Sequence, residues 1–98
     1  MSKLRVNGVE LYYELHGLAD RPLLVLNNGI IMNAASSWGF QTETLSRHYR
    51  LLQYDCRGQG QSEHPAADYS MEEHADDLAA LLTALGIESA HIAGISYG

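Results

Sequence analysis

The chain has 98 residues, of which 46% are hydrophobic and 18% charged, and 6 Lys and Arg against 12 Asp and Glu give a net charge of −6. This composition suits one small globular domain, and its acidic balance excludes a protein that binds nucleic acid by neutralising phosphates. No apolar run approaches the roughly 20 residues that span a bilayer, and no signal peptide is visible. The single cysteine cannot form an internal disulfide. We therefore expect a cytoplasmic protein without a membrane partner.

The first segment predicts a β-hairpin. Leu4 and Val6 alternate with polar residues, and Asn7-Gly8 is the two-residue turn that most strongly favours a hairpin. The second arm runs from Val9 to about Leu15, with apolar residues at every second position. Both arms are expected to be half-exposed antiparallel strands.

After the hairpin, the pattern changes to that of parallel strands. Residues 23–26, 51–54 and 90–95 are short apolar segments, and the first is apolar on both faces, as in a strand between two helical layers. A helix between the first two segments is expected to be capped by Ser36 or Ser37. It would carry apolar residues at helical spacing, namely Trp38, Leu45 and Tyr49.

The helix before the last strand is the most fully specified element. Ser70 and Glu73 form the pattern of a capping box, and Gly86 is placed for a left-handed residue after the helix, with Ile87 packing back on Leu82. An apolar stripe indicates the buried face, made of Ala75, Leu78, Ala79, Leu82 and Leu85. The order, a hairpin and then βαβαβ, predicts an α/β layered sheet.

The motif Gly-Ile-Ser-Tyr-Gly at residues 94–98 follows the last predicted strand directly. In a nucleophile elbow, a G-x-S-x-G turn between a strand and a helix presents the serine hydroxyl at the edge of the sheet. The alternative is a chance match, but its place after a strand of an α/β pattern favours the elbow. Ser96 is therefore the candidate nucleophile.

Several segments resemble the N-terminal half of the α/β-hydrolase superfamily, in the branch of enol-lactonases, haloperoxidases and esterases. They are LLVLNNGI at 23–30, SSW at 36–38, YDCRGQGQS at 54–62, and the helix and strand of residues 69–98. The resemblance implies an α/β-hydrolase-type sheet in which residues 1–98 form the N-terminal part of a single domain, truncated after the fifth strand. It places the fifth strand beside the third. It is specific for the superfamily and leaves the substrate open.

The resemblance also implies roles for particular positions. Ser96 matches the nucleophile, and the backbone N–H groups of Ile30 and Tyr97 match the two oxyanion-hole donors. Asn28 and Gly29 would support the loop that carries the first donor, where many relatives have His-Gly. The implied activity is that of a serine hydrolase that needs no cofactor and acts on a small molecule, an ester, lactone or thioester.

Two other groups of residues are interpreted as structural. A phosphate-binding role for residues 55–62 is disfavoured because a lone Gly-x-Gly is a weak signal. We expect Gly58 and Gly60 to adopt positive φ while Asp55 and Arg57 hold the loop by hydrogen bonds. Cys56 has no assignable histidine partner, which disfavours a nucleophilic cysteine.

The five histidines also lack a catalytic or metal-binding pattern. They have no paired spacing for a metal, and all precede Ser96, whereas in this fold the base follows the serine; they are His16, His48, His64, His74 and His91. We expect His48 and His74 to be solvated on helices, and the catalytic acid and base to lie after Gly98.

The 98-residue chain alone is expected to be inactive. It would also be poorly stable and associate with itself through the exposed edge of the last strand, because Ile92 and Ile95 would lose part of their burial. Two classes of function stay open at this point. One is the hydrolase, and the other is a non-catalytic α/β scaffold or fragment with no activity of its own.

Overall fold

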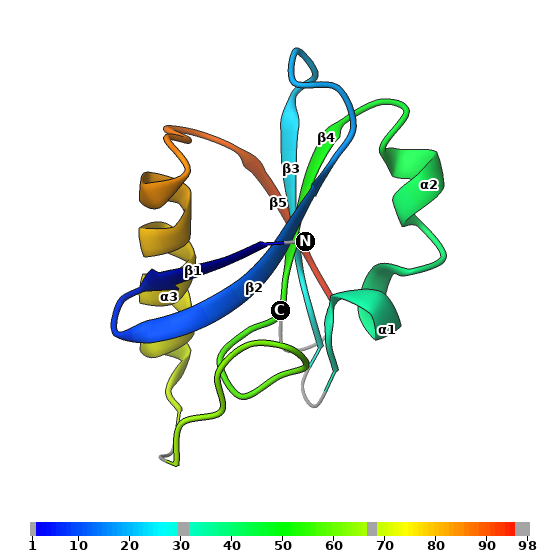
Figure 1. The fold of residues 1–98 in the computed structure, drawn as a ribbon. Helices are drawn as coiled ribbons and strands as arrows, with labels where there is room; N and C mark the ends of the chain where they lie inside the picture. Colours follow the sequence, from blue (N-terminus) through cyan, green and yellow to red (C-terminus); the bar gives the residue numbers. More distant parts are fainter. Residues whose placement is uncertain (1, 30–31, 67–68, 96–98) are drawn as a thin grey trace.

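In a computed structural model, which describes residues 2–29, 32–66 and 69–95, the strands form one sheet with helices on both of its faces (Figure 1). The strands are β1 (Ser2–Val6), β2 (Val9–His16), β3 (Leu23–Asn27), β4 (Arg50–Tyr54) and β5 (His91–Gly94). The helices are α1 (Ala34–Trp38), α2 (Thr42–Leu45) and α3 (Met71–Ala84). Helix α3 covers one face, whereas α1 and α2 lie on the other.

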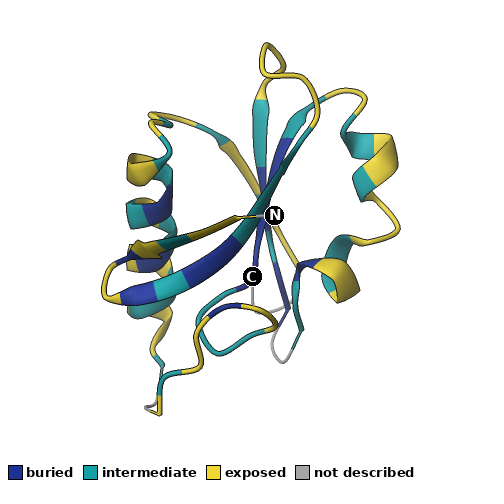
Figure 2. Ribbon diagram, viewed as in Figure 1, coloured by how far each residue is buried: buried dark blue, intermediate teal, exposed yellow. Residues whose placement is uncertain are grey.

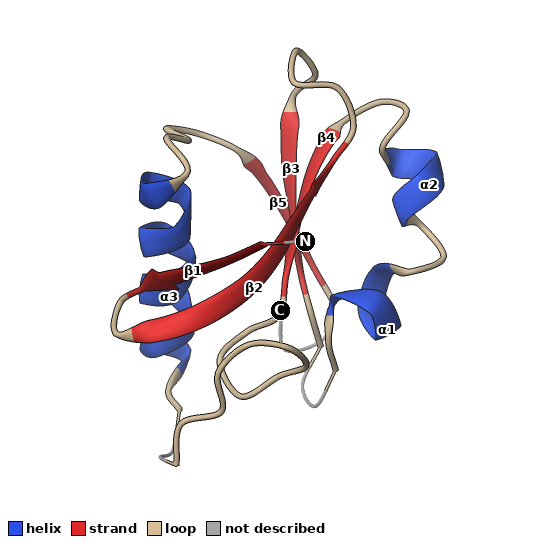
Figure 3. Cartoon of the chain, in the orientation of Figure 1, coloured by secondary structure: helices blue, strands red, loops and turns tan. Residues whose placement is uncertain are grey.

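The strand order within the described residues is β1-β2-β4-β3-β5. Strand β2 pairs antiparallel with β1 and β4, and β3 pairs parallel with β4 and β5. Both parallel connections pass through helices, as Figure 3 shows. The predicted α/β layered sheet is therefore confirmed, with β5 beside β3. Ile92 and Ile95, on and just after this edge strand, are exposed, as expected.

The hairpin has the predicted two-residue turn. Val6 pairs with Val9, and Asn7 and Gly8 both take positive φ, 49° and 76°, as a type I′ turn requires. The expectation of half-exposed strands is wrong for β2, where the adjacent residues Leu11 and Tyr12 are both buried. The segment after β4 runs alongside β2 here, with the Tyr12 N–H donating to Ser62 Oγ at 2.8 Å and the Glu63 N–H to the Glu10 carbonyl at 2.8 Å, so this part of β2 is not an open edge.

The single helix expected between β3 and β4 is instead two short ones. The cap of α1 is Asn33, whose side chain accepts a hydrogen bond from the Ser36 N–H, so neither Ser36 nor Ser37 is the cap residue. The helix ends at Trp38, and its C-cap is Gly39, a residue type that disfavours continuing a helix. The Gln41 N–H then bonds to the Trp38 carbonyl, which turns the chain into α2.

Helix α3 begins and ends as predicted. The Ser70 hydroxyl accepts from the Glu73 N–H at 3.1 Å while the Glu73 carboxylate accepts from the Ser70 N–H at 3.2 Å, which completes the capping box. Gly86 has φ 73°, and the Ile87 N–H donates to the Leu82 carbonyl at 2.9 Å. This is the Schellman arrangement expected from the sequence.

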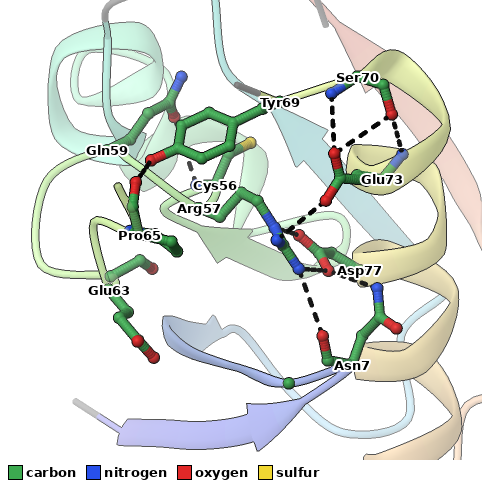
Figure 4. A network of polar contacts seen from close by, with 12 residues as sticks. Asn7, Cys56, Arg57, Gln59, Glu63, Pro65, Tyr69, Ser70, Glu73 and Asp77 are labelled. Carbon is green, nitrogen blue, oxygen red and sulfur yellow. Dashed lines mark hydrogen bonds and ion pairs between the residues drawn. The ribbon is translucent and has the colours of Figure 1, made fainter. Parts of the chain in front are cut away.

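The buried face of α3 differs from the predicted stripe. Ala75 and Ala79 are exposed, whereas Asp77 and Leu81 are buried. Asp77 faces inward because Arg57 reaches it from the segment after β4, with Nε at 2.7 Å from Oδ2 and Nη2 at 2.8 Å from Oδ1 (Figure 4). The helix therefore buries the Asp77 carboxylate, whereas the spacing of apolar residues predicts that this charged side chain lies on the surface.

Further contacts make this ion pair a link between three elements. Asn7 of the hairpin turn donates to Asp77 Oδ1 at 2.9 Å, and Glu73 lies 3.2 Å from the guanidinium (Figure 4). The hydrogen bonds to Asp77 raise the pKa of Arg57. The apolar core lies between α3 and the central strands (Figure 2), and its fully buried members are Val9, Leu11, Val25, Leu52 and Leu81.

Replacing Asp77 by Asn should lower the free energy of unfolding by about 3 kcal/mol, because the largely buried Arg57 guanidinium would lose its buried charged partner and keep only the more exposed Glu73. Urea unfolding of the purified protein measures the change. Asp76→Asn is the matched control, since Asp76 is the exposed neighbour on the same helix, and it should change stability by less than about 0.5 kcal/mol. Equal losses in the two variants would contradict a stabilising role for the ion pair.

Candidate active site at the carboxyl edge of the sheet

The carboxyl ends of β3 and β5 lie side by side. Asn27 pairs with Gly94 in the parallel register, and the Ile95 N–H donates to the Asn27 carbonyl at 3.3 Å. The two segments singled out in the sequence therefore begin at the same edge of the sheet. The predicted nucleophile and oxyanion-hole donors, Ser96, Tyr97 and Ile30, lie outside the described residues.

Asn27 fixes the end of β3 to its neighbours. Its backbone carbonyl also accepts from the indole Nε1 of Trp38 at 3.2 Å, and its side-chain Oδ1 accepts from the Tyr54 hydroxyl at 2.6 Å. The last residue of β3 is thus bonded to α1, β4 and the chain after β5. The Ser-Ser-Trp segment is recognisable in the sequence, but this contact of its tryptophan is not.

Asn28, proposed from the sequence to support the loop, is only 1% exposed. Its amide Nδ2 donates to the Tyr54 carbonyl at 2.7 Å and to Gln59 Oε1 at 3.2 Å. Its Oδ1 has no hydrogen-bond partner among the described residues, so this buried oxygen requires a donor that they do not supply. The amide holds the start of the loop against β4.

Both polar groups of the Gly29 backbone are engaged. The N–H donates to Ser37 Oγ at 3.3 Å, and the carbonyl accepts from Gln59 Nε2 at 3.1 Å and from the Met32 N–H at 3.3 Å. Sequence reasoning missed both Ser37 in this role and Gln59. The only signal for Gln59 is its place between the two glycines of residues 58–60.

The segment after β4 is held as the sequence predicted. Gly58 and Gly60 have φ 79° and 44°, and a Cβ at Gly60 would collide with the Asp55 carboxylate. Asp55 is buried, and its two oxygens accept from the Ala34 N–H at 2.8 Å and the Gln61 N–H at 2.9 Å. Asp55 therefore joins this segment to the start of α1, whereas Arg57 joins it to α3.

A cavity of about 180 Å³ opens between the ends of β3 and β4 and the first half of α3, lined by Asn27, Asn28, Tyr54, Cys56, Met71, His74, Ala75 and Leu78. The expectation that His74 is solvated is wrong. His74 is half-buried and meets the ring of Tyr69 edge to face, with 6.1 Å between the ring centroids. The Tyr69 hydroxyl donates to the Pro65 carbonyl at 2.5 Å.

The Cys56 thiol lies in the wall of this cavity. Burial raises its pKa to about 11, so the thiol is almost entirely protonated at neutral pH. A protonated thiol is a poor nucleophile. The electrostatics therefore support the prediction that Cys56 is not the reactive group.

Two further findings concern the described part of the chain as a whole. Over residues 2–29, 32–66 and 69–95, no three His, Cys, Asp or Glu side chains form a group that could hold a metal ion. Every helix in those ranges is too short or too polar to cross a membrane.

Comparison with known proteins gives a consistent family. A sequence model described as the alpha/beta hydrolase fold matches residues 22–98. The "Putative carbamate hydrolase RutD" of Azorhizobium caulinodans is 37% identical over 89 residues, which are 91% of this chain and 32% of that protein. The 3-oxoadipate enol-lactonase 2 of Acinetobacter baylyi is 37% identical over 95 residues, which are 97% of this chain and 35% of that protein.

Among solved structures, a hydrolase from Pseudomonas aeruginosa superimposes with a TM-score of 0.94 at 40% identity, over 99% of this chain and 37% of that one. The chain spans about a third of the length of the relatives it matches. Both curated relatives are hydrolases by name.

We predict that Cys56 in the native protein reacts with iodoacetamide at pH 8 about a hundred times more slowly than in the urea-unfolded protein. The factor follows from the rise of the pKa from 9.0 to about 11, which lowers the thiolate population about a hundredfold. Mass spectrometry of timed samples gives both rates, and the unfolded protein is the control. A native rate equal to or above the unfolded rate would reveal an activated thiolate and restore Cys56 as a candidate nucleophile.

Proposed function

The chain belongs to the alpha/beta hydrolase fold family, and on that premise we propose that the protein is a serine hydrolase that transfers an acyl group through Ser96 to water. The observation that carries the proposal is the pairing of Asn27 with Gly94. The G-x-S-x-G sequence begins at Gly94, so it starts at the carboxyl end of a parallel strand, beside the segment of Asn28 and Gly29. That is the context in which the motif forms a nucleophile elbow.

The proposed reaction proceeds in two acyl transfers. The Ser96 oxygen attacks the carbonyl carbon of the substrate while a general base takes the hydroxyl proton, and the N–H groups of Ile30 and Tyr97 stabilise the resulting oxyanion. Collapse of the tetrahedral intermediate breaks the bond to the leaving group, which receives that proton. Water then attacks the acyl-serine in the same manner and releases the carboxylic acid.

The general base of this mechanism is placed outside residues 1–98. In hydrolases of this fold the acid and the histidine follow the serine in the sequence, whereas all five histidines here precede Ser96. His74 lines the cavity near Asn28 and packs edge to face with Tyr69, but it too precedes Ser96. We therefore assign none of the five as the base.

The proposed substrate is an ester, lactone or thioester of a small molecule. Similarity to a relative named as an enol-lactonase, over 97% of this chain, supports the lactone within that set. The relative from Azorhizobium caulinodans is named for a carbamate, which like an ester has a carbonyl carbon bonded to a leaving group. The attack by a serine is the same in each case, and the leaving group differs.

Replacing Ser96 by Ala in the full-length protein should lower the turnover of p-nitrophenyl acetate by at least about 10³-fold, because the covalent route is lost. The melting temperature should stay within a few degrees of the parent. Ser89→Ala is the control, since Ser89 is an exposed serine shortly before β5 and should leave turnover unchanged.

Labelling with a fluorophosphonate locates the nucleophile directly. Tryptic mapping should find the adduct on Ser96 in the parent and in Ser89→Ala, and none in Ser96→Ala. An adduct on another residue would overturn the assignment of Ser96, and no adduct in folded protein would favour the non-catalytic α/β scaffold.

A further inference from the structure

Gln59 connects the two loops that flank the candidate active site. It lies between Gly58 and Gly60 in the segment after β4, and its side chain reaches the segment after β3. Its Nε2 donates to the Gly29 carbonyl at 3.1 Å, while its Oε1 accepts from Asn28 Nδ2 at 3.2 Å. Oε1 also accepts from the Cys56 N–H at 3.3 Å, which fixes the side chain to its own loop.

These contacts determine which way the Gln59 amide faces. Its oxygen meets two donors and its nitrogen meets a carbonyl, so the opposite orientation of the amide would break all three hydrogen bonds. The side chain is half-buried, which protects the bonds from exchange with water. Gln59 is therefore a directed donor toward Gly29.

The peptide group that contains the Gly29 carbonyl needs contacts from other residues to fix its orientation. Glycine permits many backbone conformations, so a peptide that follows it rotates more easily than one that follows another residue. The other donor to this carbonyl is the Met32 N–H at 3.3 Å, from the same turn. Among the described residues, Gln59 is the one in a different loop whose side chain bonds to this carbonyl.

A peptide group is planar and trans, so the direction of a carbonyl sets the direction of the N–H that follows it in the chain. We propose that Gln59 is a positioning residue, because by holding the Gly29 carbonyl it fixes the plane of the peptide whose N–H is the proposed oxyanion donor. The inference rests on the proposed function, because only there does that N–H have a chemical role. Donors held in advance stabilise the transition state without having to reorient.

The test compares Gln59→Met and Gln59→Glu with the parent in the full-length protein. Methionine has a similar length but no donor, and it introduces no charge. Glutamate keeps an oxygen for Asn28 and Cys56 but places a second acceptor against the Gly29 carbonyl. Gln41→Met is the matched control, since Gln41 is exposed and its side chain makes no capping hydrogen bond although it is the N-cap residue of α2.

The rate of fluorophosphonate labelling of Ser96 is measured over a range of probe concentrations. In both Gln59 variants the maximal labelling rate should fall about 10- to 100-fold, while the concentration for half-maximal rate changes less than about threefold. The phosphoryl oxygen takes the place of the oxyanion, so loss of an oriented donor slows the bond-forming step more than it weakens probe binding, whereas loss of folded protein lowers the final labelled fraction. The melting temperature of each variant, measured in parallel, identifies any loss of folded protein.

The outcomes separate this inference from the proposed function. Labelling of Ser96 at the parental maximal rate in Gln59→Met would overturn the positioning role and leave the serine hydrolase intact. Absence of labelling at Ser96 in the parent would overturn the proposed function and the inference together. A lower rate in both Gln59 variants but not in Gln41→Met supports the inference.

Discussion

The structure depends on one constraint, that polar groups buried at the carboxyl edge of the sheet must find partners inside the protein. Asn28, Asp55 and Ser62 are all at most 3% exposed. An unpaired polar group in such a place costs roughly 1–3 kcal/mol. Most of their polar atoms are satisfied by groups on another segment, as when Asp55 accepts from the Ala34 N–H and Asn28 donates to the Tyr54 carbonyl. The segments after β3 and β4 consequently form one hydrogen-bonded unit rather than two separate loops.

The same constraint explains how the helical layer is fixed to that unit. Arg57 extends from the segment after β4 to Asp77, and the pair is tolerated in a buried place because the two groups meet in a bidentate geometry. Asn7 adds the hairpin turn to the same contact. The first turns of α3 are therefore tied to the loop by polar contacts, whereas Leu81 anchors its second half in the apolar core. Polar contacts near the start of the helix and apolar packing near its end together fix the place of α3 on the sheet.

The parts of this fold that could be predicted from the sequence are those set by neighbours in the chain. The Asn7-Gly8 turn, the Ser70 cap and the Gly86 ending each depend on residues at most five positions apart. The face of α3 was mispredicted because its partner, Arg57, lies 20 residues away, and the apolar pattern carries no record of an ion pair. The candidate nucleophile came from a motif, but the contact of Gln59 with Gly29 spans 30 residues and has no local signature. Only the assembled sheet edge reveals it.

The carboxylates near the sheet edge are paired with donors, which suits the proposed chemistry although the chain as a whole is acidic. The chain carries a net charge of −6, and an unpaired carboxylate beside a developing oxyanion would oppose it. Asp55 is the buried carboxylate of this edge, and backbone N–H groups engage both of its oxygens. Asp77 is held on the α3 side by Arg57. The side chains that contact the Gly29 backbone, Ser37 and Gln59, are both neutral. The Ser37 hydroxyl accepts from the Gly29 N–H and the Gln59 amide donates to the Gly29 carbonyl, so both side chains hold the Gly29 backbone without adding a fixed negative charge beside it.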